Sequence, residues 1–211
     1  MKVIETFLSI QGEGVDSGLL TFFVRFSGCN LRCSYCDTKY AYAGGSEMNI
    51  EEIIKLIGKT KAKKICLTGG EPLLQKDLKE LIKKLIELDY EVNIETNGSV
   101  KLPIWVKNKK ICVSMDIKCP SSGMSDKMIY ENLSVLKEKD VVKFIIGDRN
   151  DYDFAKKIIK KIKKANIIFN PVYGQCDLKK LVEDLIKDQL DNVRFGIQLH
   201  KIIWGPRKKG V

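Results

Sequence analysis

The stretch FSGCNLRCSYCDTKYA, residues 26–41, places three cysteines within one short segment. They are Cys29, Cys33 and Cys36, in the spacing C-x3-C-x2-C. A disulfide joins two cysteines, and a structural zinc ion usually takes four protein ligands. Three thiolates on one segment therefore either have a distant fourth partner or leave one metal position open for another ligand.

A zinc site would need its fourth ligand from elsewhere in the chain. The candidates are Cys66, Cys112, Cys119, Cys176 and the only histidine, His200. Cys66 and Cys112 lie in apolar runs, which favours buried thiols, whereas Cys119 and Cys176 lie near expected strand ends or loops. An iron–sulfur cluster with one free iron matches the triad better, and a zinc site remains the alternative.

Length and composition describe an ordinary globular chain. It has 211 residues, of which 44% are hydrophobic and 30% charged, which suits one domain with its own core. No run approaches the roughly 18 apolar residues of a membrane helix, and MKVIETFLSIQGEG meets acidic residues and glycine too early for a signal peptide. We therefore expect a cytoplasmic protein without a membrane partner, whose seven cysteines are metal ligands or buried thiols.

The formal net charge of +10 allows two interpretations. A basic surface can bind nucleic acid or attract small anions. Much of the excess, however, lies in segments such as AKKIIKKIKKAN and LKELIKKLIEL, where lysines fill the gaps between apolar residues at helical spacing. This pattern favours solvated helix faces, and we expect no nucleic-acid partner.

Strand-like and helix-like segments alternate along the chain. The expected strands are 2–10, 19–28, 63–68, 91–96, 111–118, 141–146, 166–171 and 192–200, and the expected helices are 50–57, about 78–85, 126–137, 152–164 and 178–187. Asn49 and Glu52 form a predicted capping box for the first helix. Six or seven βαβ units are fewer than a full barrel needs, so we expect an α/β fold with a mainly parallel, curled sheet: a truncated, partly open (β/α) barrel. It would be one domain, 1–211, with a short N-terminal strand and turn as an extension.

Polar, glycine-rich motifs follow the expected strands. They are SGCNLRCSYC, TGGEP, ETNG, DIKCPSSG, NPVYG and QLHK. The carboxyl ends of parallel strands form the active face of α/β folds. We therefore expect these six motifs to meet in space.

The cysteine spacing, with Tyr35 just before the last cysteine, resembles the signature of radical S-adenosylmethionine (SAM) enzymes. A second motif of that family, GGE, follows the next strand at residues 69–71. The resemblance implies that Cys29, Cys33 and Cys36 hold a 4Fe-4S cluster whose fourth iron chelates SAM. It also implies a reductant, such as flavodoxin or ferredoxin, because the reduced cluster cleaves SAM to a 5′-deoxyadenosyl radical.

A narrower resemblance rests on the ordered set SIQGEG, FVRFSGCNLRCSYCDT, LTGGEPLLQ, IETNG, DIKCPSSG and QLHK. From Phe7 to the C-terminus the chain is similar to the 7-carboxy-7-deazaguanine synthases. The resemblance implies a lyase that converts 6-carboxy-5,6,7,8-tetrahydropterin to 7-carboxy-7-deazaguanine and ammonia, in 7-deazapurine biosynthesis of the queuosine or archaeosine type. It also implies Mg2+ and a homodimer.

The same resemblance assigns cofactor contacts. The expected SAM-binding residues are Tyr35, Cys36, Asp37, Gly70, Ser114, Lys118, Asn170, Pro171, Val172 and Tyr173. The Ser114–Lys118 pair stands for the family's Ser-x-Lys contact, although the spacing here is longer. Thr38 matches the position that ligates Mg2+, an ion that keeps waters and takes substrate oxygens.

Substrate contacts combine this resemblance with chemistry. The expected residues are Ile10, Gln11, Gly12, Glu13, Arg25, Thr68 and Pro206. Arg25 follows the apolar FFV, so burial requires a partner, and a bidentate guanidinium suits a planar carboxylate; a surface ion pair is the alternative. The amide of Gln11 offers a donor and an acceptor to a pterin edge. His200 is given no acid–base role.

Two other functions share parts of this pattern. A radical SAM activase, which installs a glycyl radical on a partner enzyme, would have the same cysteine loop and no pterin site. A non-enzymatic iron–sulfur or zinc module would have the cysteines alone. The GGE motif in register with the triad argues against the second.

Overall fold

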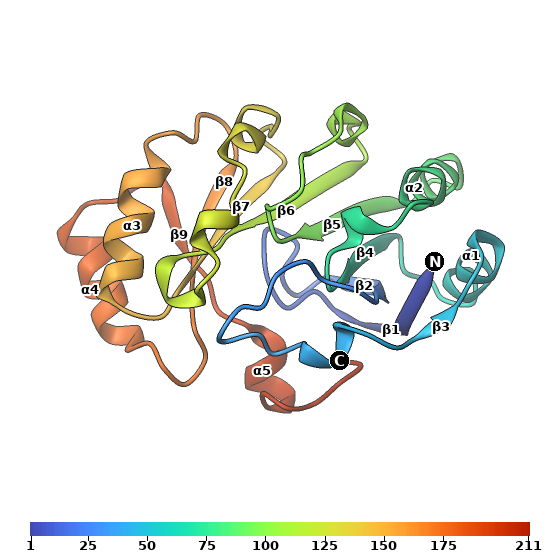
Figure 1. Ribbon diagram of the computed structural model, residues 1–211, viewed down its shortest axis with the longest axis horizontal. Coiled ribbons are helices and arrows are strands. Elements are labelled where there is room, and N and C mark those ends of the chain that lie inside the picture. Colours follow the sequence, from blue (N-terminus) through green and yellow to red (C-terminus); the bar gives the residue numbers. More distant parts are fainter.

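One nine-stranded sheet runs through the whole chain (Figure 1). The computed structural model describes residues 1–211. Its strands are β1 Lys2–Ile10, β2 Leu20–Phe26, β3 Ser46–Glu47, β4 Lys64–Gly69, β5 Glu91–Thr96, β6 Ile111–Ile117, β7 Val141–Ile146, β8 Asn166–Pro171 and β9 Val193–Phe195. Their spatial order is β3-β1-β2-β4-β5-β6-β7-β8-β9.

All neighbours from β2 to β9 are parallel. Strand β1 alone runs antiparallel to both β2 and β3, and so forms the expected N-terminal extension. Strands β3 and β9 do not pair, which leaves the sheet open between its two edges. The predicted partly open barrel is confirmed.

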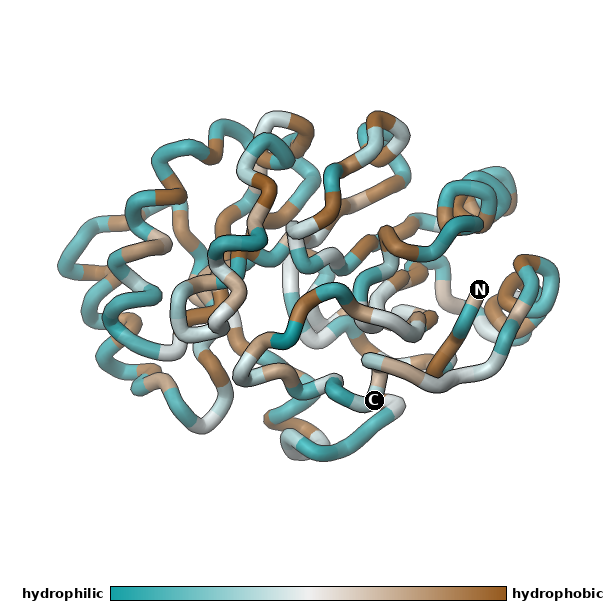
Figure 2. The backbone as a smooth tube through the Cα atoms, viewed as in Figure 1, coloured by the Kyte–Doolittle hydropathy of each residue, from teal (hydrophilic) through white to brown (hydrophobic).

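Four helices cover the outer face of the curved sheet: α1 Ile50–Ile57, α2 Leu78–Glu87, α3 Arg149–Ile159 and α4 Leu178–Lys187 (Figure 1). A fifth, α5 Leu199–Trp204, lies apart from them beside the N-terminal turn. The capping box of α1 is present: Asn49 Oδ1 accepts from the Glu52 amide at 2.9 Å, and Glu52 Oε2 accepts from the Asn49 amide at 2.7 Å. Figure 2 shows mostly hydrophilic residues along α1 to α4, as expected for solvated lysine faces. None of the helices has the length and apolarity required to cross a bilayer.

The helix predicted for 126–137 is wrong. The segment forms two short 3-10 turns, Ser125–Lys127 and Tyr130–Ser134. Its Asn132 is 1% exposed and bonds to another loop: Nδ2 donates to Val100 O at 2.9 Å, and Oδ1 accepts from the Leu102 amide at 2.8 Å. These long-range bonds to the loop after β5 replace the sequential bonds of a helix.

Two further boundaries differ from the prediction. Helix α3 spans 149–159 rather than 152–164, because Asp148 caps it by accepting from the Asp151 amide at 2.9 Å. The last strand ends at Phe195 rather than near His200, and α5 follows. There the Leu199 amide bonds to Gly12 O at 3.0 Å, so this segment leaves the sheet and contacts the N-terminal turn.

A buried carboxylate joins the loops that follow β6 and β7. Asp151 is fully buried and accepts from the Ser121 and Gly147 amides, both at 2.8 Å, and from the Ser121 hydroxyl. Ser121 O in turn accepts from the hydroxyl of Ser34, in the cysteine loop, at 2.7 Å. The chain of bonds therefore supports the loop that carries the cysteine triad.

Asp151→Ala should lower the free energy of unfolding by about 2–3 kcal/mol, because it leaves three partly buried donors without their acceptor. Asp153→Ala is the matched control: this side chain is 46% exposed and pairs with Arg149, so its loss should cost less than about 1 kcal/mol. Thermal denaturation of both variants checks the difference. Equal stability of the two would contradict the role of Asp151.

Candidate active site

A single cavity at the carboxyl edge of the parallel strands brings most of the sequence motifs together. Among the residues that line it are Gln11, Glu13, Arg25, Cys29, Cys33, Tyr35, Cys36, Thr68, Gly70, Glu95, Asp116, Lys118, Lys143, Tyr173 and His200. They come from the β1–β2 turn, from the ends of β2, β4, β5, β6, β7 and β8, and from α5. The expected convergence of the motifs is confirmed.

The three cysteines are free thiols on the loop after β2, and all three line the cavity. Cys29 Sγ accepts from the Leu31 amide at 3.4 Å and from Asn97 Nδ2 at 3.7 Å. No three His, Cys, Asp or Glu side chains are grouped closely enough to hold a single metal ion. Three soft thiolates on one loop suit a 4Fe-4S cluster, which is larger than a single ion and takes cysteine ligands.

The other cysteines do not complete a zinc site. Cys66 and Cys119 are fully buried, and burial raises the pKa of the Cys66 thiol well above its usual range. Cys112 and Cys176 are half-buried and lie outside this cavity. Cys66 lines the same cavity, but no group of His, Cys, Asp or Glu side chains that includes it is close enough to hold one metal ion.

The GGE turn lies directly against the cysteine loop. A Cβ at Gly70 would come within 1.9 Å of Gly28 O and 2.9 Å of Cys29 Cβ. The Gly70 amide donates to Phe26 O at 3.1 Å, and the Glu71 amide donates to Gly28 O at 2.8 Å. Only glycine permits this approach, so the GGE turn packs directly against the first cysteine of the triad.

Glu71, the last residue of that motif, has a role that the sequence analysis did not assign. Its carboxylate is fully buried and accepts from the Leu73 amide at 3.0 Å, the Thr96 hydroxyl at 2.9 Å and the Asn97 amide at 2.7 Å. Burial nevertheless raises its pKa to about 7. The sequence does contain a signal for this cap: an acidic residue stands directly before a proline that begins a helical turn.

The structure brings most of the predicted SAM residues to the cavity. Those that line it are Tyr35, Cys36, Asp37, Gly70, Lys118, Val172 and Tyr173, whereas Ser114, Asn170 and Pro171 do not. Ser114 is buried behind the β1–β2 turn, and Asn170 Nδ2 donates to Glu13 Oε2 at 3.1 Å. The hydroxyl of Tyr35 is buried without a partner, which leaves it available to a ligand.

Most predicted substrate residues also line the cavity. They are Ile10, Gln11, Gly12, Glu13, Arg25 and Thr68; Pro206 lies outside it, and Val211 from the same tail lines it. Gln11 is 5% exposed; its Oε1 accepts from the Gly12 amide at 2.9 Å, but its buried Nε2 has no partner. An orphaned donor at this depth points to a bound ligand or water.

Arg25 is paired, as its burial required. Its Nε donates to Glu5 Oε1 at 2.7 Å, and Tyr40 OH donates to the same oxygen at 2.8 Å. The terminal guanidinium nitrogens make no hydrogen bond within the protein. They are therefore available to a carboxylate in the cavity.

Helix α5 and the residue before it line the cavity near the C-terminus. A strand was expected for this segment, so these contacts were not predicted. Gln198 Nε2 donates to Glu13 Oε1 at 2.6 Å, and Lys201 Nζ pairs with Asp37 Oδ2 at 2.6 Å. The ring of His200 lies against Gly12, where a Cβ would come within 2.2 Å of Nδ1. Gln198 and Lys201 belong to the QLHK motif that was expected at the active face, although neither was assigned a contact.

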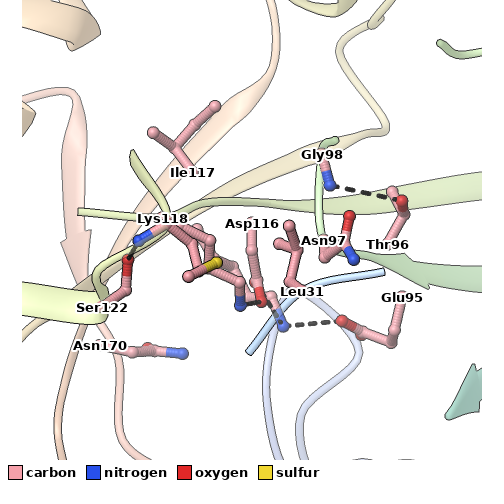
Figure 3. A network of polar contacts seen from close by, with 12 residues as sticks. Leu31, Glu95, Thr96, Asn97, Gly98, Asp116, Ile117, Lys118, Ser122 and Asn170 are labelled. Atoms are coloured by element: carbon pink, nitrogen blue, oxygen red, sulfur yellow. Dashed lines mark hydrogen bonds and ion pairs between the residues drawn. The ribbon is translucent and has the colours of Figure 1, made fainter. Parts of the chain in front are cut away.

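Charged side chains form the floor of the cavity. Glu95 on β5 and Asp116 on β6 point toward the same space (Figure 3), and Lys143 on β7 pairs with both, at 2.7 and 3.4 Å. Lys118 pairs with Asp116 at 2.6 Å. Of these residues, only Lys118 was predicted.

An open, parallel (β/α) barrel with three thiolates and a two-glycine turn at its active face defines a radical SAM enzyme. The model of the radical SAM superfamily matches residues 23–185. Relatives named 7-carboxy-7-deazaguanine synthase are 43% identical in Clostridium acetobutylicum, over 100% of this chain and 99% of theirs, and 43% identical in Methanospirillum hungatei, over 98% and 86%. The chain belongs to the family of 7-carboxy-7-deazaguanine synthases.

Solved structures show the same fold. The crystal structure of QueE from Escherichia coli superposes with a TM-score of 0.78 at 21% identity, covering 94% of each chain. The structure of anSMEcpe with bound AdoMet superposes with a TM-score of 0.57 at 18% identity, covering 85% of this chain and 64% of that one. The open barrel is therefore common to these proteins.

Glu71→Gln should change the pH dependence of stability. Because the folded-state pKa of Glu71 lies near 7 and its usual value is 4.5, the wild type loses stability as pH rises through this window, by on the order of 3 kcal/mol. Glutamine does not titrate, so the Tm of the wild type relative to the variant should be higher at pH 5 than at pH 8. Glu80→Gln, on the exposed face of α2, is the control and should follow the wild type. A difference that does not vary with pH would contradict the assignment.

Proposed function

We propose that the protein converts 6-carboxy-5,6,7,8-tetrahydropterin to 7-carboxy-7-deazaguanine, with release of ammonia, for 7-deazapurine biosynthesis. One observation carries the proposal: the cavity that holds the cysteine triad also holds a cation, amides and carboxylates suited to a polar bicyclic acid. Full-length relatives named for this activity support it.

In this proposal Cys29, Cys33 and Cys36 would ligate a 4Fe-4S cluster, and the GGE turn in the same cavity would help to hold SAM. When bound, these cofactors supply a carbon radical that removes a hydrogen atom from the substrate. Gly70, Tyr35 and Lys118 form the surrounding wall. Their part is to hold SAM in place and to exclude water from the reaction.

The pterin would lie on the opposite wall. The terminal nitrogens of Arg25 bind its carboxylate, since Nε is held by Glu5 and the guanidinium is already oriented. The orphaned amide of Gln11 and the carboxylate of Glu13 meet the polar ring edge. Thr68, at the end of β4, completes this wall.

Mg2+ is the third proposed cofactor, with Thr38 as its protein ligand. Thr38 lines the cavity, and its hydroxyl donates to Asp37 Oδ1 at 2.9 Å, so oxygen atoms are available on both residues. Hard oxygens and retained waters suit Mg2+. The ion would orient the substrate carboxylate.

We also infer the wider setting. The chain acts as one domain, 1–211, because a single continuous sheet carries every part of the site. Seven free cysteines without a disulfide fit a reducing compartment, which supports a cytoplasmic location. A one-electron donor such as flavodoxin or ferredoxin would reduce the cluster, and a homodimer is the proposed assembly.

The direct test incubates the anaerobically reconstituted protein with SAM, a reductant, Mg2+ and carboxytetrahydropterin. We expect 7-carboxy-7-deazaguanine and ammonia, measured by chromatography and mass spectrometry. Each of Cys29→Ala, Cys33→Ala and Cys36→Ala should abolish the cluster absorbance and the product, while Cys176→Ala, outside the cavity, should keep both. Cleavage of SAM without deazaguanine would favour an activase, and an intact cluster in all three variants would overturn the ligand assignment.

Thr38→Ala should weaken the response to Mg2+. We expect the Mg2+ concentration for half-maximal turnover to rise about tenfold or more, because a ligand oxygen is lost from the ion. Thr60→Ala is a control, since its hydroxyl bonds to Ile57 O at 2.9 Å and Thr60 does not line the cavity. An unchanged Mg2+ response in Thr38→Ala would count against this ligand.

A further inference from the structure

Lys143 is a buried lysine at the centre of an anionic cluster. It is 5% exposed, and its Nζ lies 2.7 Å from Glu95 Oε2, 3.1 Å from Glu13 Oε2 and 3.4 Å from Asp116 Oδ1. All four side chains line the reaction cavity. Lysine is rarely buried unless its ammonium group is paired with acidic groups, so the burial of Lys143 depends on these carboxylates.

The register of the sheet explains how the cluster forms. Asp116 on β6 is directly opposite Lys143 on β7, and Glu95 on β5 is opposite Ser114, two residues before Asp116. Residues two apart on a strand share a face, so all three charged side chains point to the inside of the barrel. Glu13 reaches them from the β1–β2 turn.

Each of the two glutamates is held at both oxygens. Glu13 Oε1 accepts from Gln198 at 2.6 Å, and Oε2 accepts from Lys143 and Asn170, both at 3.1 Å. Glu95 Oε1 accepts from Asn93 at 2.9 Å, and Oε2 accepts from Lys143. Lys143 is the one group that contacts both carboxylates, so it sets their distance and direction.

The ammonium group of Lys143 also favours the ionised form of both glutamates. Three carboxylates face only two ammonium groups, those of Lys143 and Lys118. Burial raises the pKa of Glu13 and Glu95, and Lys143 opposes this rise at both; the pKa of Glu13 ends below its usual range, while that of Glu95 stays above it. Without Lys143, like charges at this separation could not all remain ionised in a buried site.

We infer that Lys143 is a positioning residue for substrate binding: its ammonium keeps Glu13 and Glu95 anionic and aimed into the cavity, as paired acceptors for N–H donors on the substrate ring. This inference rests on the proposed function. A purely structural ion pair would not require both carboxylates to line the cavity, as they do here. The remaining negative charge on the floor suits a ligand edge that presents N–H groups.

The test compares Lys143→Met and Lys143→Arg in the reconstituted holoenzyme. Met keeps the length without the charge, so we expect KM for carboxytetrahydropterin to rise about 100-fold with a much smaller change in kcat. Arg keeps the charge with a different geometry, so its KM should rise about tenfold. Cluster absorbance and the dissociation constant of SAM should match the wild type in both.

Lys156→Met is the matched control, because Lys156 pairs with Asp188, at the end of α4, at 2.6 Å, and neither residue lines the cavity. Its KM should equal that of the wild type. A KM within threefold of wild type in Lys143→Met, or in Lys143→Arg if only that variant folds, would overturn the inference. Failure of the proposed function is distinct, because then the wild type itself would form no deazaguanine.

A double-mutant cycle with Glu95→Gln tests whether Lys143 acts through its partner. If it does, Lys143→Met should raise KM at least tenfold less in the Glu95→Gln enzyme than in the wild type. Independent, multiplicative effects on KM would contradict the inference. The cycle therefore separates positioning of a substrate ligand from a direct contact of Lys143 with the substrate.

Discussion

The active face depends on a buried carboxylate that fastens neighbouring loops to one another. Glu71 accepts from the Asn97 amide on the loop after β5, while its own amide donates to Gly28 O in the cysteine loop. The parallel ladder places these loop ends side by side, and Glu71 sets their separation. These bonds support the cysteine loop that would hold the cluster.

Around this anchor one cavity holds both the three thiols with the two-glycine turn and a set of charged and amide side chains. These polar side chains are cross-linked, through Lys143 to Glu13 and Glu95 and through Gln198 to Glu13. Charges fixed in this way cost little reorganisation when a ligand binds, which is the condition for orienting a substrate.

Local patterns predicted much of this molecule. The strand 91–96, the helices 50–57 and 178–187 and the Asn49 cap agree with the structure because they depend on neighbours in sequence. The prediction of a helix at 126–137 is wrong because Asn132 bonds to a loop about 30 residues away in the sequence. The prediction that the last strand extends to residue 200 is wrong because the first residue of α5 hydrogen-bonds to Gly12, near the other end of the chain.

The sequence by itself determined the class of chemistry and the open barrel, since the spacing of the cysteines, the GGE motif and the order of strands and helices are local properties of the chain. Only the tertiary structure decided which charged residues meet. Lys143, Glu95 and Asp116 come from separate strands, and Lys201 reaches Asp37 across 164 positions. Such pairings depend on the register and curvature of the whole sheet, which no short stretch of residues encodes.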